Sequence, residues 1–148
     1  MNYWHMNLHP TGGQGTDEEI RNIVLSRTIG MGIFYRKDGE IDPQVTDFKK
    51  RVKIGDIVAI LNGLTPIALV EVIGDWYEFD RDSNSIIWFP LRRSVRILCV
   101  RGGENDDYIA KLPPIPMSRT KTLTISIGKD TDTYQYIHAW YEYCRNRA

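Results

Sequence analysis

The chain opens with alternating apolar and polar residues over YWHMNLH, residues 3–9. The apolar side carries Trp4, Met6 and Leu8, and the polar side carries His5, Asn7 and His9. Alternation with a period of two is typical of a strand that buries one face. Pro10 and the glycines of TGGQG end this pattern. We therefore predict a first strand whose polar side faces solvent.

Three stretches predict helices. TDEE at residues 16–19 fits a capping box, which favours a helix over about residues 17–26. VTDFKKRV at residues 45–52 predicts a short second helix. Near the C-terminus, DTYQYIHAWYEYC predicts an amphipathic helix, because its apolar residues follow the i, i+3, i+4, i+7 spacing. Those residues are Ile137, Trp140, Tyr141 and Cys144.

The middle of the chain has the apolar runs and turn residues of a β-sheet. Strands are expected at IGMGIFYR, KIGDIVAIL, PIALVEVIGDWYEF (bent at Gly74) and IIWFPLRRSVRILCV (interrupted at Pro90). The pair Asn62-Gly63 predicts a hairpin turn, and TKTLTISI is either a last strand or a short helix. Together these elements predict an α+β fold. We expect a small, strongly bent antiparallel sheet or open β-barrel, flanked by two or three short helices.

Length and charge limit the function classes. The 148 residues suit one domain over residues 1–148, either complete or the N-terminal part of a longer protein. Nineteen basic residues balance nineteen acidic ones, so binding of nucleic acid requires a local basic face. Two isolated cysteines, no signal-peptide pattern and no apolar run of membrane-spanning length predict a cytoplasmic protein without a membrane partner.

Motifs for catalysis and cofactor binding are missing from the sequence. There is no GxxxxGK[ST], GxGxxG or GxSxG pattern. His5 and His9 lie on one face of the first strand, but a zinc site needs a further ligand. We therefore expect no catalytic residue, no metal and no cofactor. A small hydrolase that uses His5 or His9 with a carboxylate remains an alternative.

Two groups of basic residues are candidates for contacts with nucleic-acid phosphates. KKRVK supplies Lys49, Lys50, Arg51 and Lys53, and the strand after Pro90 supplies Arg92, Arg93 and Arg96. By alternation, Arg92 and Arg96 share one face of that strand. Phosphate contact is the functional interpretation. A solvated helix end, with lysines near its C-terminus, is the structural alternative for the first group.

Aromatic residues are frequent on the predicted strands: Trp4, Phe34, Tyr35, Trp76, Tyr77, Trp88 and Phe89. Most aromatics at such positions belong to a core. Alternation nevertheless prevents Trp76 and Tyr77, or Trp88 and Phe89, from both facing inward. Some of these rings are therefore expected at the surface or in a cleft, where a flat base can stack on them.

Four segments resemble the PUA-like superfamily, in particular the EVE-like and YTH-related domains at the N-terminus of modification-dependent (type IV) restriction proteins. They are YWHMNLHP, IGMGIFYR, the pair KIGDIVAILNG and PIALVEVIGDW, and WFPLRRSVRIL. The resemblance covers roughly residues 3–100. The TGGQG loop and the stretch after Val100 depart from the pattern.

This resemblance implies a DNA-binding specificity module that recognises a modified base, typically a methylated cytosine, flipped into an aromatic pocket. The implied pocket residues are Trp4, His5, Asn7, Ser26, Ile29, Phe34, Trp76 and Phe89. His5 or Asn7 would read a base edge, since both side chains can donate and accept. The two basic groups would hold the backbone of the modified DNA. Cleavage would belong to a nuclease, GTPase or ATPase domain or subunit of the same restriction system.

Two other functions stay open besides the hydrolase. One is an RNA-binding PUA-like or YTH-like module that reads modified RNA. The other is a protein-interaction domain whose aromatic residues all lie in the core.

Overall fold

A computed structural model of the chain describes residues 1–8, 15–79, 87, 89–103, 106–116 and 122–146. The strands are β1 (Tyr3–Asn7), β2 (Thr28–Met31), β3 (Ile57–Asn62), β4 (Thr65–Val72), β5 (Tyr77–Glu78), β6 (Leu91–Val100) and β7 (Leu123–Ser126). The helices are α1 (Asp17–Leu25), α2 (Pro43–Thr46), α3 (Asp107–Lys111) and α4 (Asp132–Asn146). A π-helical turn, η1 (Asp47–Arg51), continues α2.

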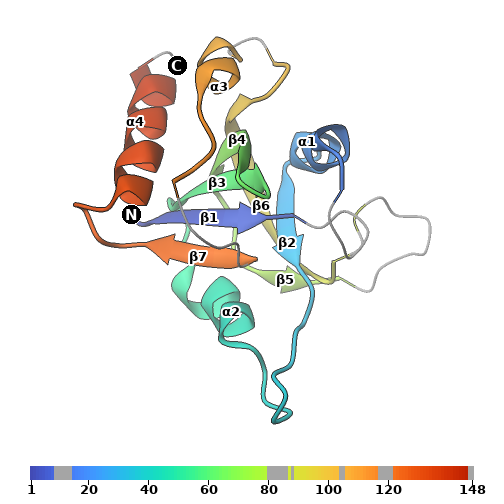
Figure 1. The fold of residues 1–148 in the computed structure, drawn as a ribbon. Coiled ribbons are helices and arrows are strands. Elements are labelled where there is room, and N and C mark those ends of the chain that lie inside the picture. Colours follow the sequence, from blue (N-terminus) through green and yellow to red (C-terminus); the bar gives the residue numbers. More distant parts are fainter. Residues whose placement is uncertain (9–14, 80–86, 88, 104–105, 117–121, 147–148) are drawn as a thin grey trace.

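The strands form one strongly curled sheet in the order β2-β6-β4-β3-β1-β7, and β5 pairs with the start of β6. Figure 1 shows α4 beside the N-terminal end of β1, and α2 below β7. The strand pairs are antiparallel except for β1 and β3, which are parallel. The α+β class and the strongly bent sheet are therefore confirmed.

The two faces of the sheet pack on two separate apolar clusters. The α1 core lies between the sheet, α1 and η1, and its largest side chains include Trp4, Met6, Ile20, Phe48 and Phe89. The α4 core lies between the sheet, α3 and α4, and contains Tyr3, Ile57, Leu69, Ile137 and Trp140. Both sides of β1 are consequently covered, so every residue of this strand is buried.

Local sequence signals explain most of the elements. Thr16 and Glu19 form both hydrogen bonds of the capping box at the start of α1. Gly63 has φ 61° in the turn between β3 and β4, as an Asn-Gly hairpin requires. Residues 123–126 form a strand rather than a helix. The helix α3 falls in the stretch after Val100, for which no element is predicted above.

Candidate nucleic-acid interface

The candidate interface has two features. The first is a basic turn, which we define as Lys49, Lys50, Arg51 and Lys53. It lies at the end of η1 and directly after it. The side chains of Lys50, Arg51 and Lys53 are exposed, and Lys49 is half-buried. The one ion pair of Arg51 among the described residues joins it to Asp47 at 3.4 Å. The basic turn therefore presents a net positive charge to solvent.

Arg93 holds the basic turn in place from inside the protein. Its side chain is 1% exposed, in the α1 core. The guanidinium donates to the carbonyl oxygens of Phe48 (3.0 Å), Lys49 (3.2 Å), Val52 (2.7 Å) and Gly74 (2.9 Å). Three of these carbonyls belong to η1 and to the residue that follows it, where the helix leaves such groups unpaired.

This placement corrects the expectation that Arg93 contacts phosphate. An arginine whose donors are committed to buried carbonyls is not available to a ligand. By alternation, Arg93 lies on the same side of β6 as Leu91 and Val95, both in the α1 core. The sequence pattern already separated Arg93 from Arg92 and Arg96 in this way.

The second feature is an aromatic patch on and beside β5, which we define as Trp76, Tyr77 and Phe79. Trp76 is half-buried against the α1 core, whereas Tyr77 and Phe79 are exposed. The Lys49 ammonium lies 4.6 Å from the centre of the Trp76 ring, and the Arg92 guanidinium lies 4.4 Å from that of Phe79. The two residues that flank this short strand, Trp76 and Phe79, thus each pair a ring with a cation.

The arginines on the outer side of β6 are less available than the basic turn. Arg92 is 7% exposed and donates to the carbonyl oxygens of Phe89 and Ile87 at 3.0 Å each. Arg96 is exposed but forms an ion pair with Glu71. Both residues lie on the face that alternation predicts, yet both guanidinium groups already bind groups of the protein itself.

The structure does not bring the eight expected pocket residues together. Trp4, Ile29 and Phe89 are fully buried in the α1 core, with Phe34 and Trp76 at its edge. Ser26 is exposed at the end of α1. His5 and Asn7 lie on the opposite side of the sheet, facing the α4 core. One pocket that contains both groups is therefore incompatible with this fold.

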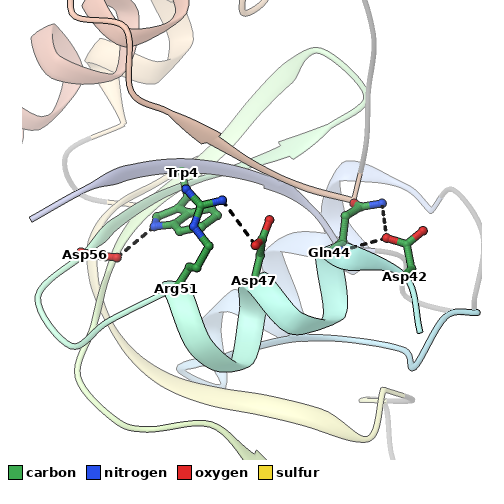
Figure 2. A network of polar contacts seen from close by, with 6 residues as sticks. All are labelled: Trp4, Asp42, Gln44, Asp47, Arg51 and Asp56. Atoms are coloured by element: carbon green, nitrogen blue, oxygen red, sulfur yellow. Dashed lines mark hydrogen bonds and ion pairs between the residues drawn. The ribbon is translucent and has the colours of Figure 1, made fainter. Parts of the chain in front are cut away.

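Trp4 is fixed in the α1 core by a polar partner. Its indole Nε1 donates to Oδ2 of Asp56 at 2.9 Å (Figure 2). The same carboxylate accepts from the backbone N–H groups of Asn2 (2.9 Å) and Lys53 (3.0 Å). Asp56 thereby ties β1 to the basic turn. This role rests on contacts between distant segments, and no local sequence signal reveals it.

A groove of about 330 Å³ lies between α2 and β7. Its lining comprises Asp42, Pro43, Gln44, Asp47, Leu123, Thr124 and Ile125. Figure 2 shows Gln44 and Asp47 on the helix beside this strand, and Gln44 Oε1 accepts from the Leu123 N–H at 2.8 Å. Because Asp42 and Asp47 are acidic, this groove is a poor site for a phosphate.

The polar side of β1 differs from the sequence-based expectation, since α4 and its neighbours cover it. His5 is 4% exposed and Asn7 5%. Burial lowers the pKa of His5 to about 4, so the imidazole is neutral at pH 7. Within the described part of the chain, no group of three or more His, Cys, Asp and Glu side chains is placed to hold a metal. His9 and Trp88 lie outside the described residues.

Comparisons with known proteins do not show a family. No family model matches the chain, and no curated protein matches it. Protein Atu2648 from Agrobacterium tumefaciens has a similar crystal structure, with 15% identity and a TM-score of 0.43. The alignment covers 98% of this chain and 92% of that one. A hypothetical protein from Leishmania major gives 14% identity, a TM-score of 0.46, and coverage of 98% and 97%.

These likenesses are too distant to support a function. Separately, no helix in the described ranges combines the length and the apolar character that crossing a membrane requires.

Proposed function

We propose that this protein is a DNA-binding module that recognises a modified base, most simply a methylated cytosine, within a restriction system. The bound face would be the basic turn together with the aromatic patch. The observation that carries this proposal is the contact between them, with Lys49 positioned over the Trp76 ring. Cations beside accessible rings suit a ligand that combines phosphates with flat bases.

The basic turn would supply the contacts to the DNA backbone. Three of its four side chains are exposed, and Arg93 holds the carbonyls beneath them, so the charges project from a rigid support. Each phosphate neutralised by such a side chain releases condensed counterions. Binding should therefore weaken steeply as the salt concentration rises.

The aromatic patch would supply stacking for a base extruded from the duplex. Tyr77 and Phe79 are exposed, and Trp76 is half-buried. Stacking on one aromatic ring contributes about 1–3 kcal/mol per base, which offsets the few kcal/mol that extrusion costs. A methyl group adds apolar contact area, and discrimination would come from its fit beside these rings.

The test is a binding titration of the full chain with matched DNA duplexes. The duplexes carry cytosine, 5-methylcytosine, 5-hydroxymethylcytosine or N6-methyladenine, and an RNA oligomer of the same sequence completes the set. We expect the tightest binding to one modified DNA. Tighter binding to RNA would replace the proposal with an RNA-reading module, and no binding to any probe would refute a nucleic-acid function.

Three variants locate the interface: Trp76→Ala in the aromatic patch, Lys49→Ala in the basic turn, and a lysine outside both. Trp76→Ala should remove the preference for the modified duplex, because it deletes the ring under Lys49. Lys129→Ala is the matched control, since Lys129 is exposed in the loop before α4, outside the proposed face. If Lys129→Ala weakens binding as much as Lys49→Ala does, the proposed face is wrong.

A further inference from the structure

The two cysteines of the chain, about 45 positions apart in the sequence, lie side by side in the α4 core. Cys99 is on β6, and Cys144 is in the last turn of α4. Their thiols are within hydrogen-bond reach of each other, and both are reduced in this structure. The sequence alone gives no sign of this contact, because it depends on how α4 packs against the sheet.

The fold fixes the positions of both thiols. Cys99 lies opposite Leu69 of β4, and cross-strand neighbours share one face of a sheet, so both side chains point toward α4. Cys144 follows Trp140 by four residues and Ile137 by seven, which places all three on the buried side of the helix. The cysteines are only 3% and 8% exposed. The packing of a whole helix therefore holds the two sulfur atoms together.

A third buried group beside the thiols has an unused donor. Trp140 is fully buried, and its Nε1 makes no hydrogen bond of ordinary geometry among the described residues. A buried N–H in this state costs stability, and most such groups are paired. This indole N–H acts on Cys99, where it favours the thiolate. A thiolate accepts hydrogen bonds more strongly than a thiol does, so the donor is placed for the ionised form.

The surroundings of Cys99 make it the more reactive of the two cysteines. The pKa of the Cys99 thiol is lowered, chiefly by the hydrogen bond from the Cys144 thiol and further by the Trp140 indole N–H. Burial and the negative charges of Asp106 and Asp107 oppose this shift. The thiolate, and not the thiol, is the nucleophile. We therefore expect Cys99 to react first.

We propose that Cys99 and Cys144 are a redox-active pair that forms a disulfide when the protein meets hydrogen peroxide. The Cys99 thiolate attacks one peroxide oxygen, the O–O bond breaks, and the leaving hydroxide takes the proton that Cys99 released. The products are a Cys99 sulfenic acid and one water.

The second step closes the disulfide. The Cys144 sulfur attacks the Cys99 sulfur, the S–O bond breaks, and the hydroxyl group leaves with the Cys144 proton as a second water. Two thiols are thereby oxidised to one disulfide, and one peroxide is reduced to two waters. This inference goes beyond the proposed function and does not rest on DNA binding.

Peroxide would reach the pair through the end of α4. Cys144 lies two residues before this helix ends at Asn146, and the last turns of helices fray. Hydrogen peroxide is uncharged and close to water in size, so a brief local opening admits it. The disulfide would join α4 to β6 and close a loop of about 45 residues. Oxidising conditions would thus fix α4 on the sheet.

The test counts thiols in the full chain after the native protein has been treated with hydrogen peroxide. The reaction is quenched, and the protein is unfolded in excess iodoacetamide so that every remaining thiol is alkylated. We expect a monomer that takes up no label, has lost two hydrogen atoms in mass, and takes up two labels after reduction with dithiothreitol. Its Tm should rise by about 8–16 °C above that of the reduced protein, as a cross-link over this loop length predicts.

Variants assign the separate steps. Cys144→Ala should stop at the Cys99 sulfenic acid, which dimedone traps, whereas Cys99→Ala should react at least about tenfold more slowly than the wild type. Trp140→Phe removes the indole N–H, and Ile137→Val is its matched control, because it loosens the same core and keeps that donor. We expect Trp140→Phe to react about threefold to tenfold more slowly than Ile137→Val, as for one lost hydrogen bond. Equal rates would contradict the role of the indole N–H.

Two results would overturn the proposal. One is that both cysteines of the wild type still take up label after the treatment. The other is oxidation of each cysteine without a bond between them, or a bond between two copies of the chain. Both results are read from the sulfur atoms alone, so they are independent of whether the protein binds DNA.

Discussion

The two sides of β1 are buried to the same degree but differ in how their polar groups are paired. On the side of the α1 core, the Trp4 indole N–H has Asp56 as a partner, and that carboxylate accepts two further bonds. On the side of the α4 core, His5, Asn7 and Ser126 keep atoms for which the described residues provide no partner. The first side is built for stability. The second keeps buried polar atoms that the described residues do not pair.

A similar contrast separates two arginines of β6, Arg93 and Arg96. Arg93 donates to four carbonyls inside the α1 core, while Arg96 forms a single ion pair at the surface. Burial makes the first set of contacts structural, because each freed carbonyl would be left unpaired. The exposed ion pair of Arg96 contributes little to the free energy of unfolding, because solvent screens it. The consequences of mutation should follow this order.

The largest loss should come from Arg93→Ala. It leaves four carbonyls unpaired and detaches the end of η1 from the segment at Gly74. We expect the free energy of unfolding to fall by about 4 kcal/mol, measured by urea denaturation. A loss below about 1 kcal/mol would show that water replaces the guanidinium and that the support is not rigid.

A smaller loss is expected for Asp56→Ala, which removes the partner of Trp4. Three N–H groups lose their acceptor, so we predict a decrease of about 3 kcal/mol in the free energy of unfolding. Asp47→Ala is the control, because its carboxylate forms only a loose ion pair with Arg51 among the described contacts. Equal losses in both variants would contradict the special role of the Trp4 side.

The His5 side predicts a dependence of stability on pH. The pKa of His5 is lowered to about 4, below its usual value of 6.5, so the unfolded chain takes up the proton first as pH falls. Stability is therefore full above pH 6.5 and decreases between pH 6.5 and 4. We expect a loss of about 2 kcal/mol from pH 7 to pH 5 at this residue. The loss should be absent in His5→Leu, and its persistence there would assign it to another group.

The smallest effect is expected for Arg96→Ala. Its ion pair with Glu71 is exposed, and exposed pairs contribute about 0–1 kcal/mol. Thermal unfolding should show a shift of at most about 4 °C. A larger shift would mean that this surface pair is coupled to the packing of the sheet.

Local patterns predicted much of the fold but little of the pairing between distant segments. The capping box before α1, the Asn62-Gly63 turn and the apolar spacing of α4 depend on neighbouring residues, and each is found where the sequence places it. The parallel pairing of β1 with β3 is different, because it depends on how segments that are distant in the sequence come together in space.

The sequence of β1 likewise does not predict that both of its sides are buried, because apolar and polar residues alternate along it. Alternation identifies two faces but does not tell whether a helix covers the polar one. The candidate interface shows the same limit. The exposure of the basic turn follows from its sequence, whereas the attachment of Lys49 to Trp76 depends on the fold.

The most direct test of the central claim is the salt dependence of DNA binding. The logarithm of the binding constant is plotted against the logarithm of salt concentration for the wild type and for a variant with alanine at Lys49, Lys50, Arg51 and Lys53. Each lost phosphate contact reduces the slope by about 0.9, so the loss of all four predicts a slope smaller by about 3.6 in the variant. An unchanged slope, or no binding by the wild type at low salt, would contradict a DNA-binding role for this face.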